Sequence, residues 1–586
     1  MRICNNQKLK TKSPRHRRFQ VALIGLLMGG LVACKSTSGP KVKDDFSAPG
    51  AREYWISGVD SVTLEPEYAG KPEPLRLERA HYLAGIRRVA VAWFLNAYLA
   101  DKEAGDPNIY WGKFNAQVRF GNDTDQVEVR KLAALSYAFD FKFGVAGYTD
   151  LIARIATDLH LKAGAHTFSL PMPNLNNALM AELKTHHEWF RDEPWDFWGP
   201  QATPAEEQRQ VTMQIEAQPT YSDAYLPIDK LVADGHMSIA VHFGWDGENP
   251  GRRNDIALSE VMFEQLRQMG FQVPSPTFAS YQPFKPETAP FKKSIKVNGK
   301  DVSVEVRVYF GGQHGNGVEV AGPDITTDAG GKIVGAEMRR SLAGKQVVVY
   351  IGHSGIRRGF NLADWNQTAE GNLSPVELAT LPMLNSFQMV VAEGCQTYYL
   401  ADAFWQNPAK RNRENLNLIT SNGFTASASI TTATRLIKAL TNQSTAAGPP
   451  QMISPRVSTV LAALNRDYKI PFPRNAMAGS AHLTEGDEDD PLFPVYGLHG
   501  VAEDPRTDPL ASAKSICEPC RDKLSCGGDG NICSRMSDGR TYCTLGCTDD
   551  LGCAQAVGAG YRCHAPANAG EAGVCVPVAS ACNTVR

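Results

Sequence analysis

The chain has 586 residues, of which 43% are hydrophobic and 21% charged, and its formal net charge at pH 7 is −2. A chain of this length exceeds one hydrophobic core, so we expect two domains and a smaller module. The balanced charge excludes a strongly basic protein, and we expect no nucleic-acid partner.

Residues 1–33 have the pattern of an export signal. Seven basic residues and no acid precede the apolar run "FQVALIGLLMGGLVA", which is too short and too glycine-rich to predict a membrane span. "LVAC" resembles the bacterial lipobox, which implies that Cys34 is lipidated and anchors the chain to a membrane. Lys35 follows, and by resemblance to lipoprotein sorting rules this implies the outer membrane. Loss of the segment changes the net charge from −2 to −9, because seven positive charges leave with it.

Residues 34–50 are predicted to be a tether, and residues 51–230 a mixed α+β domain of unknown fold. Helical periodicity extends over 76–100 and 174–190, whereas 114–120 and 211–217 alternate like strands. "HHEWFR" is not a zinc motif, because Arg191 occupies the position of the second histidine.

Residues 231–470 are predicted to form an α/β domain, a mostly parallel sheet with helices on both faces. Apolar runs alternate with amphipathic stretches, which is typical of such sheets. The clearest predicted helix covers 254–271, with Asn254 or Asp255 as N-cap and Gly270 as its stop. The apolar runs are 237–245, 302–312, 345–355, 387–395 and 415–423. Residues 471–516 are acidic and proline-rich and are interpreted as a linker. Its "EGDEDD" could hold calcium, but a solvated linker is favoured.

Residues 517–586 are predicted to be a disulfide-rich module. The segment contains ten of the thirteen cysteines and few large apolar residues. Because the export signal at residues 1–33 implies an oxidising compartment, these features favour five disulfides of unknown pairing. A zinc site at Cys517, Cys520, Cys543 and Cys547 is the alternative, but it leaves six cysteines unexplained. The segment also resembles Cys-rich modules at the C-termini of secreted myxobacterial proteins. The ten cysteines are Cys517, Cys520, Cys526, Cys533, Cys543, Cys547, Cys553, Cys563, Cys575 and Cys582.

This count leaves Cys395 without a partner, because Cys4 departs with the signal and Cys34 is lipidated. Cys395 follows the apolar run "MVVA", and His353 follows "VVVYI". Reactive groups gather at the carboxyl ends of parallel strands, and 42 residues between the two leave room for a crossover. If the strands are neighbours, the thiol and the imidazole face one cleft.

The pattern resembles the caspase, legumain, gingipain and clostripain group of cysteine peptidases over about residues 231–470. In that group one apolar strand ends in His-Gly and the next in an acidic residue or Gln, a small residue and Cys. The resemblance implies that Cys395 is the nucleophile, His353 its base, Gly394 the small residue and Glu393 the acidic position. Ser354 departs from the pattern, since it separates His353 from Gly355.

A peptidase of this kind would hydrolyse peptide bonds of a peptide or protein substrate without a cofactor or metal. A thiol needs a neighbouring base to become a thiolate nucleophile. Backbone N–H groups at Gly355 and Cys395 are predicted to stabilise the oxyanion. Acidic residues could line a pocket for a basic side chain, namely Glu393 and Asp246, with Asp364 and Asp402 as further candidates.

Three alternatives stay open. Cys395 could be a buried structural thiol in a catalytically inactive, surface-binding lipoprotein. His314, which also follows a strand-like run, could replace His353. "GHSGI" approaches the serine-hydrolase elbow, with Ser354 as nucleophile and Asp402 and His499 as partners, but Ile356 stands where the second glycine belongs.

Overall fold

The structure is a computed structural model, and two folded domains and parts of a small C-terminal sheet are described. The described residues are 51–99, 114, 116–119, 127–174, 176, 205–218, 225–247, 253–313, 320–355, 358–395, 397–422, 431–444, 451–452, 455–457, 460–461, 464, 496–500, 531–535, 541–547, 553, 561–564 and 573–577. The predicted signal and tether, nearly all of the predicted helix over 174–190, His314 and the acidic "EGDEDD" lie outside them.

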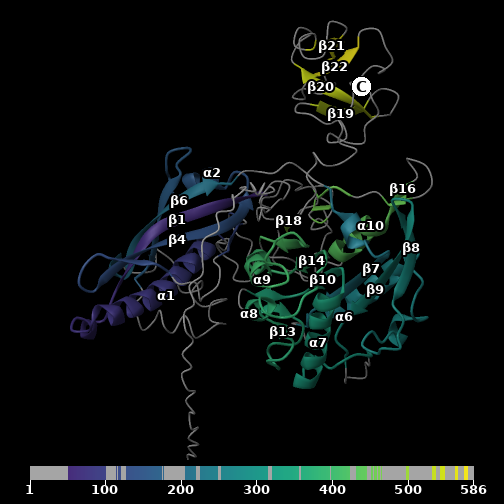
Figure 1. Ribbon diagram of the computed structural model, residues 1–586, viewed down its shortest axis with the longest axis horizontal. Coiled ribbons are helices and arrows are strands. Elements are labelled where there is room, and N and C mark those ends of the chain that lie inside the picture. Colours follow the sequence, from purple (N-terminus) through teal and green to yellow (C-terminus); the bar gives the residue numbers. More distant parts are fainter. Residues whose placement is uncertain are drawn as a thin grey trace, which may run out of the picture. The chain divides into compact units, whose positions relative to one another are not determined.

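The first domain is built on a six-stranded antiparallel sheet with the order β2-β4-β1-β6-β5, in which β3 also pairs with β4. Strands β6, β1 and β4 lie side by side in Figure 1. Two long strands form its centre and pair along their whole length. The strands are β1 (Ala51–Thr63), β2 (Gln117–Arg119), β3 (Val129–Lys131), β4 (Ser136–Tyr148), β5 (Thr167–Pro173) and β6 (Gln208–Ala217). The helices are α1 (Glu73–Leu99) and α2 (Leu151–Asp158), with short 3-10 turns η1 (Pro66–Tyr68) and η2 (Ala205–Glu207).

Helix α1 packs on this sheet with a stripe of side chains four residues apart. Leu83, Val91, Leu95 and Leu99 are fully buried, which is the pattern expected of a helix face that covers a sheet. Arg87 lies within the stripe and is also buried. Its Nε donates to Asp60 of β1 over 2.9 Å, so the charge that the helix buries has a partner.

The second domain contains a nine-stranded sheet with the order β16-β17-β8-β9-β7-β10-β14-β15-β18. Its strands are β7 (His236–Phe243), β8 (Phe291–Val297), β9 (Lys300–Tyr309), β10 (Val347–Ile351), β14 (Gln388–Glu393), β15 (Leu416–Ser421), β16 (Gln443–Ser444), β17 (Gln451–Met452) and β18 (Tyr496–Gly500). The helices are α5 (Ile228–Leu231), α6 (Asn254–Gln268), α7 (Asp328–Gly344), α8 (Pro375–Leu378), α9 (Leu400–Gln406) and α10 (Thr431–Thr441), with turns η3 (Phe278–Ser280) and η4 (Thr397–Tyr399). A small separate sheet contains β11 (Ser354–Gly355), β12 (Gly359–Asn361) and β13 (Asn372–Leu373).

Helices cover both faces of the large sheet because the central strands are apolar on both sides. Alternate residues of β10 point to opposite faces. Val347 and Val349 join the core that contains α6 and α10, whereas Val348 and Tyr350 join the core that contains α7 and α9. The predicted double cover of this sheet is therefore present.

The predicted mostly parallel sheet is wrong for the molecule as described, whose sheets are largely antiparallel. In the large sheet the five neighbouring strands β9-β7-β10-β14-β15 pair in parallel, and so do β17 and β8. β8 and β18 pair antiparallel with the two ends of this group. The first-domain sheet and the described C-terminal sheet are antiparallel throughout.

Two further predictions change in detail. Strand β18 lies within the segment that was interpreted as a linker, so the second domain extends to Gly500. Arg253 is the N-cap of α6, rather than Asn254 or Asp255. Asp255 is instead buried, where it accepts hydrogen bonds from the Arg253 guanidinium. Gly270 does end the helix, with a φ of +82° that favours glycine.

The C-terminal module contains β19 (Asn531–Arg535), β20 (Thr541–Cys547), β21 (Tyr561–His564) and β22 (Gly573–Pro577) in one four-stranded sheet. Disulfides join Cys547 to Cys563 and Cys553 to Cys575, and Cys543 is also disulfide-bonded. The sulfurs of Cys547, Cys553 and Cys563 lie within 4.8 Å of one another. Because they belong to disulfides, they are not thiolate ligands, and the zinc alternative fails for Cys543 and Cys547.

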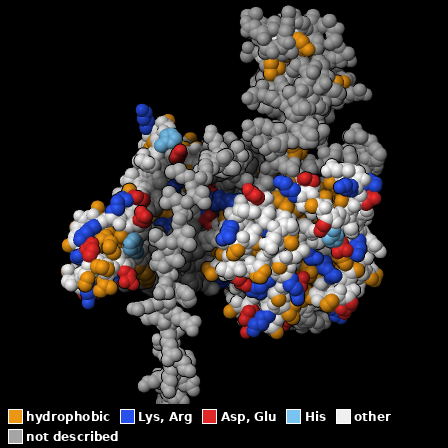
Figure 2. Space-filling view, in the orientation of Figure 1, with side chains coloured by type: hydrophobic (Ala, Val, Ile, Leu, Met, Phe, Trp, Pro, Cys, Tyr) orange, Lys and Arg blue, Asp and Glu red, His pale blue; other side chains and the backbone are white. Residues whose placement is uncertain are grey.

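The described surface carries both signs of charge. Figure 2 shows basic and acidic side chains interspersed over the second domain on the face in view. Among the described residues, no helix is both long and apolar enough to cross a membrane.

Candidate active site

Three neighbouring parallel strands, β7, β10 and β14, end at the same edge of the large sheet. Phe243, Ile351 and Glu393 are paired in register across them. His353 and Cys395 each lie two residues beyond the last paired position, Ile351 with Glu393. Asp246 follows β7 at the same edge. The strands before His353 and Cys395 are therefore neighbours, which is the condition on which the predicted shared cleft depends. That the thiol and the imidazole face one cleft stays a prediction.

The backbone that carries His353 is fixed by the buried hydroxyl of Tyr350. This hydroxyl donates to the His353 carbonyl and accepts from the Asn361 N–H over 3.0 Å. The Asn361 N–H also reaches the His353 carbonyl over 3.2 Å. Gly244 leaves the necessary space, since a Cβ there would come within 2.5 Å of the Tyr350 hydroxyl oxygen.

The imidazole of His353 lies between an acid and two indoles. Its Nε2 is 3.6 Å from Oδ1 of Asp246, and both side chains are largely buried. The ring meets Trp365 edge-on at 4.9 Å between centroids, and Trp245 lies 6.5 Å away. The carboxylate can orient the ring and stabilise an imidazolium, while the indoles restrict its movement.

Among the described cysteines, Cys395 is the one that carries a thiol rather than a disulfide, and it is partly exposed. Hydroxyl groups hold the turn around it: Ser354 Oγ donates to the Cys395 carbonyl over 2.5 Å, and Ser421 Oγ to the Gly394 carbonyl over 2.6 Å. A Cβ on Gly394 would lie 2.5 Å from Ser354 Oγ. Any larger residue would force neighbouring atoms to move, which explains why a glycine precedes Cys395.

The serine-hydrolase alternative is not favoured by the contacts of its three residues. Ser354 is buried, and its hydroxyl is engaged with the Cys395 carbonyl. Asp402 forms an ion pair of 3.3 Å with Arg119. His499 is buried on β18 and shares a hydrogen bond with the Thr420 hydroxyl. These contacts do not join the three residues into a relay.

Gly355, the predicted oxyanion donor, lies on β11 close to the cysteine turn. Its carbonyl accepts a hydrogen bond from the hydroxyl of Tyr399, four residues after Cys395. The Gly355 peptide is therefore held against the same turn. Donation from its N–H to an oxyanion stays a prediction.

The acids that were predicted to line a basic-specific pocket have other surroundings. Asp246 faces His353, and Asp364 accepts from the Asn366 N–H and the Gln367 amide. Glu393 is 1% exposed, and burial raises its pKa to about 8. The hydroxyls of Thr432 and Tyr496 lower that pKa only in part, and no described donor reaches either Glu393 oxygen with good hydrogen-bond geometry.

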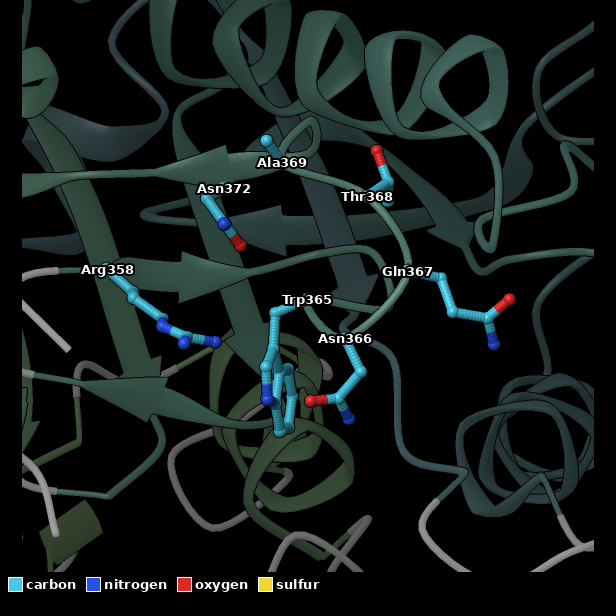
Figure 3. Close-up of a pocket in the computed structure, with 7 residues that line it drawn as sticks. All are labelled: Arg358, Trp365, Asn366, Gln367, Thr368, Ala369 and Asn372. Carbon is cyan, nitrogen blue, oxygen red and sulfur yellow. The ribbon is translucent and has the colours of Figure 1, made fainter. Parts of the chain in front are cut away.

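A polar pocket of about 380 Å³ is lined by Trp365 (Figure 3), whose indole also contacts the His353 ring. The side chains of Arg358 and Asn372 point toward the Trp365 indole, and the guanidinium is 5.8 Å from the ring centroid. The lining residues are Arg358, Trp365, Asn366, Gln367, Thr368, Ala369 and Asn372. Among the described residues, this lining contains a cation and amides but no acid. The sequence analysis did not predict this pocket, although the two adjacent arginines of "RRG" that follow His353 indicated a local positive charge.

Comparisons of the chain with protein-family models, with curated proteins and with solved structures found no match.

Proposed function

We propose that the chain is a cysteine endopeptidase in which Cys395 and His353 form the catalytic dyad. The observation that carries the proposal is that the two residues follow adjacent parallel strands, β10 and β14, each two residues beyond the last pair in register. The resemblance of the strand endings to the caspase and legumain group supports the same assignment. Asp246, which follows strand β7, is added as the residue that orients His353.

In the proposed reaction, His353 accepts the proton of the Cys395 thiol, and the thiolate attacks the carbonyl carbon of the scissile bond. The tetrahedral intermediate collapses as the imidazolium donates its proton to the leaving amine. Water, deprotonated by His353, then attacks the thioester, and the carboxylate product and the free thiol are released. Fixed backbone N–H groups near Gly355 and Cys395 would stabilise each oxyanion.

The pocket lined by Trp365 supports a preference for polar or acidic substrate side chains. Arg358 supplies a positive charge, and its stacking on Trp365 restricts the guanidinium before a ligand arrives. A basic side chain would meet the same charge unfavourably. We therefore do not propose a pocket for a basic side chain at Asp246 or Glu393.

The lipid anchor at Cys34 and an outer-membrane location remain part of the proposal on the sequence alone. Basic run, apolar run and "LVAC" occur in the order that export and lipidation need.

The test of the dyad is hydrolysis of a denatured protein substrate, with cleavage sites mapped by mass spectrometry. Cys395→Ala and His353→Ala should each lower the rate by at least about a hundredfold, because general base catalysis alone contributes on that order. Ser354→Ala should lower the rate only a few-fold, because it removes the hydrogen bond to the Cys395 carbonyl but leaves the nucleophile. His314→Ala should retain the activity.

Two outcomes would contradict the proposal. Activity that survives Cys395→Ala but not Ser354→Ala would favour the serine hydrolase. A wild-type chain that neither cleaves protein nor reacts with a thiol-directed reagent at Cys395 would favour the inactive, surface-binding lipoprotein.

A further inference from the structure

The residues that follow Cys395 are held by side chains of the first domain. Tyr398, in turn η4, is fully buried and packs against Ala51 and Ala146 at the end of the first-domain sheet. Its hydroxyl donates to the carboxylate of Glu53 on β1. The two residues are 345 positions apart in the sequence.

Arg119 of β2 completes a polar cluster around this tyrosine. Its guanidinium lies 3.4 Å from Glu53 and 3.3 Å from Asp402 of α9, and its carbon is 5.4 Å from the centre of the Tyr398 ring. We call Glu53, Arg119, Tyr398 and Asp402 the Tyr398 cluster. Gly144 of β4 leaves room for it, since a Cβ there would lie 3.2 Å from the Tyr398 hydroxyl.

The burial of the cluster makes its geometry specific. Glu53 is 6% and Arg119 8% exposed, so each charge depends on the other members for its hydrogen bonds and ion pairs. A buried network of this kind stabilises one arrangement and is costly to disturb, because a charge that loses its partner stays out of water. The Tyr398 ring therefore has a fixed position relative to β1 and β2.

The residues on either side of Tyr398 connect it to the turn that contains Cys395. The Thr397 hydroxyl donates to the Ala392 carbonyl over 2.7 Å, and the Tyr399 hydroxyl donates to the Gly355 carbonyl. Turn η4 is thus bonded to the strand before Cys395 and to the predicted oxyanion segment. A shift of Tyr398 would move both.

We propose that the first domain positions the turn that bears Cys395 through the Tyr398 cluster, so that Glu53, Arg119 and Tyr398 are positioning residues of the catalytic unit. The proposal rests on the proposed peptidase function. It assigns the first domain a role in the reaction, although none of its residues in the cluster needs to touch the substrate.

The test compares two buried acids on the same strand. Glu53→Gln weakens the Tyr398 cluster, whereas Asp60→Asn weakens the first-domain pair with Arg87, which lies outside the cluster. Both variants are examined in the full-length protein for thermal unfolding, for kcat and KM, and for the rate of iodoacetamide labelling at Cys395. Tyr398→Phe, which removes only the hydroxyl, is the milder variant should Glu53→Gln fail to fold.

Glu53→Gln and Tyr398→Phe should lower kcat, by about tenfold and a few-fold respectively, with little change in KM, since a displaced nucleophile loses reaction geometry more than binding. They should also change the labelling rate. Asp60→Asn should lower the unfolding temperature but leave kcat and labelling near wild type.

Equal effects of Glu53→Gln and Asp60→Asn on kcat and labelling, or no effect of Glu53→Gln on either, would overturn the positioning role. Absence of peptidase activity in the wild type would overturn the proposed function instead. In that case the labelling rates at Cys395 still decide whether the cluster positions the turn.

Discussion

Asp246 is the residue whose assignment the structure alters most, because it faces His353 across 3.6 Å. We predict that Asp246→Asn lowers kcat by roughly tenfold to a hundredfold, since an amide orients the imidazole poorly and cannot stabilise an imidazolium by charge. KM should change little. Asp364→Asn is the matched control, because Asp364 is equally buried but caps a turn. Equal losses in both variants would mean that Asp246 acts only through stability.

At the residue scale, the sequence predicts the two groups that chemistry makes unusual. Cys395 stands out because the other cysteines have assignments, and His353 because it follows an apolar run. In the sequence, Asp246 is only a carboxylate that follows a strand. Its role becomes evident only from the pairing of β7 with β10. Arg358 and Trp365 lie in an aperiodic connection, and nothing local indicates that they meet.

At the element scale, apolar runs and helical periodicity located most strands and helices of the second domain. They could not give strand direction at the edges. β8 joins β9 through the two-residue turn at Asn298 and Gly299, both with positive φ, which makes that pair antiparallel. β18 was missed because "YGLHG" is short and follows an acidic stretch, and only its pairing with β15 identifies it.

Strand β14 ends in a buried acid, and this yields a pH-dependent stability. Burial raises the pKa of Glu393 from 4.5 to about 8, so the folded state keeps a proton that the unfolded chain has already lost. The free energy of unfolding should therefore decrease as pH rises from about 4.5 to about 8, by at most ~1.4 kcal/mol per pH unit. Glu393→Gln should remove this decrease, measured by urea unfolding across that range.

The exposed Glu260→Gln on α6 serves as the control and should keep the wild-type slope. A wild-type stability that stays constant across the range, or a decrease that persists in Glu393→Gln, would contradict a protonated Glu393.

At the scale of the whole molecule, the relation between domains was beyond sequence reasoning. The first domain shows clear local periodicity, as in α1, yet its contact with the cysteine turn joins Glu53 to Tyr398 across most of the chain. Each residue alone resembles an ordinary surface or core position. Only the folded chain brings Glu53, Arg119 and Tyr398 together at turn η4, which follows Cys395 in the sequence.

The cysteine inventory gives the last prediction for the whole chain. Two disulfides and a disulfide-bonded Cys543 are present among the described residues, and Cys395 carries a thiol. Because the ten tail cysteines are even in number and the module has little core, we expect all ten to be paired.

Iodoacetamide should therefore modify one cysteine, Cys395, in the folded, lipidated protein, and ten more after reduction and denaturation. Cys395→Ala should show no adduct before reduction. Adducts at several tail cysteines before reduction, or zinc released on denaturation, would contradict the disulfide module. An additional adduct at Cys34 would instead contradict lipidation, since a thioether-linked lipid leaves no thiol to alkylate.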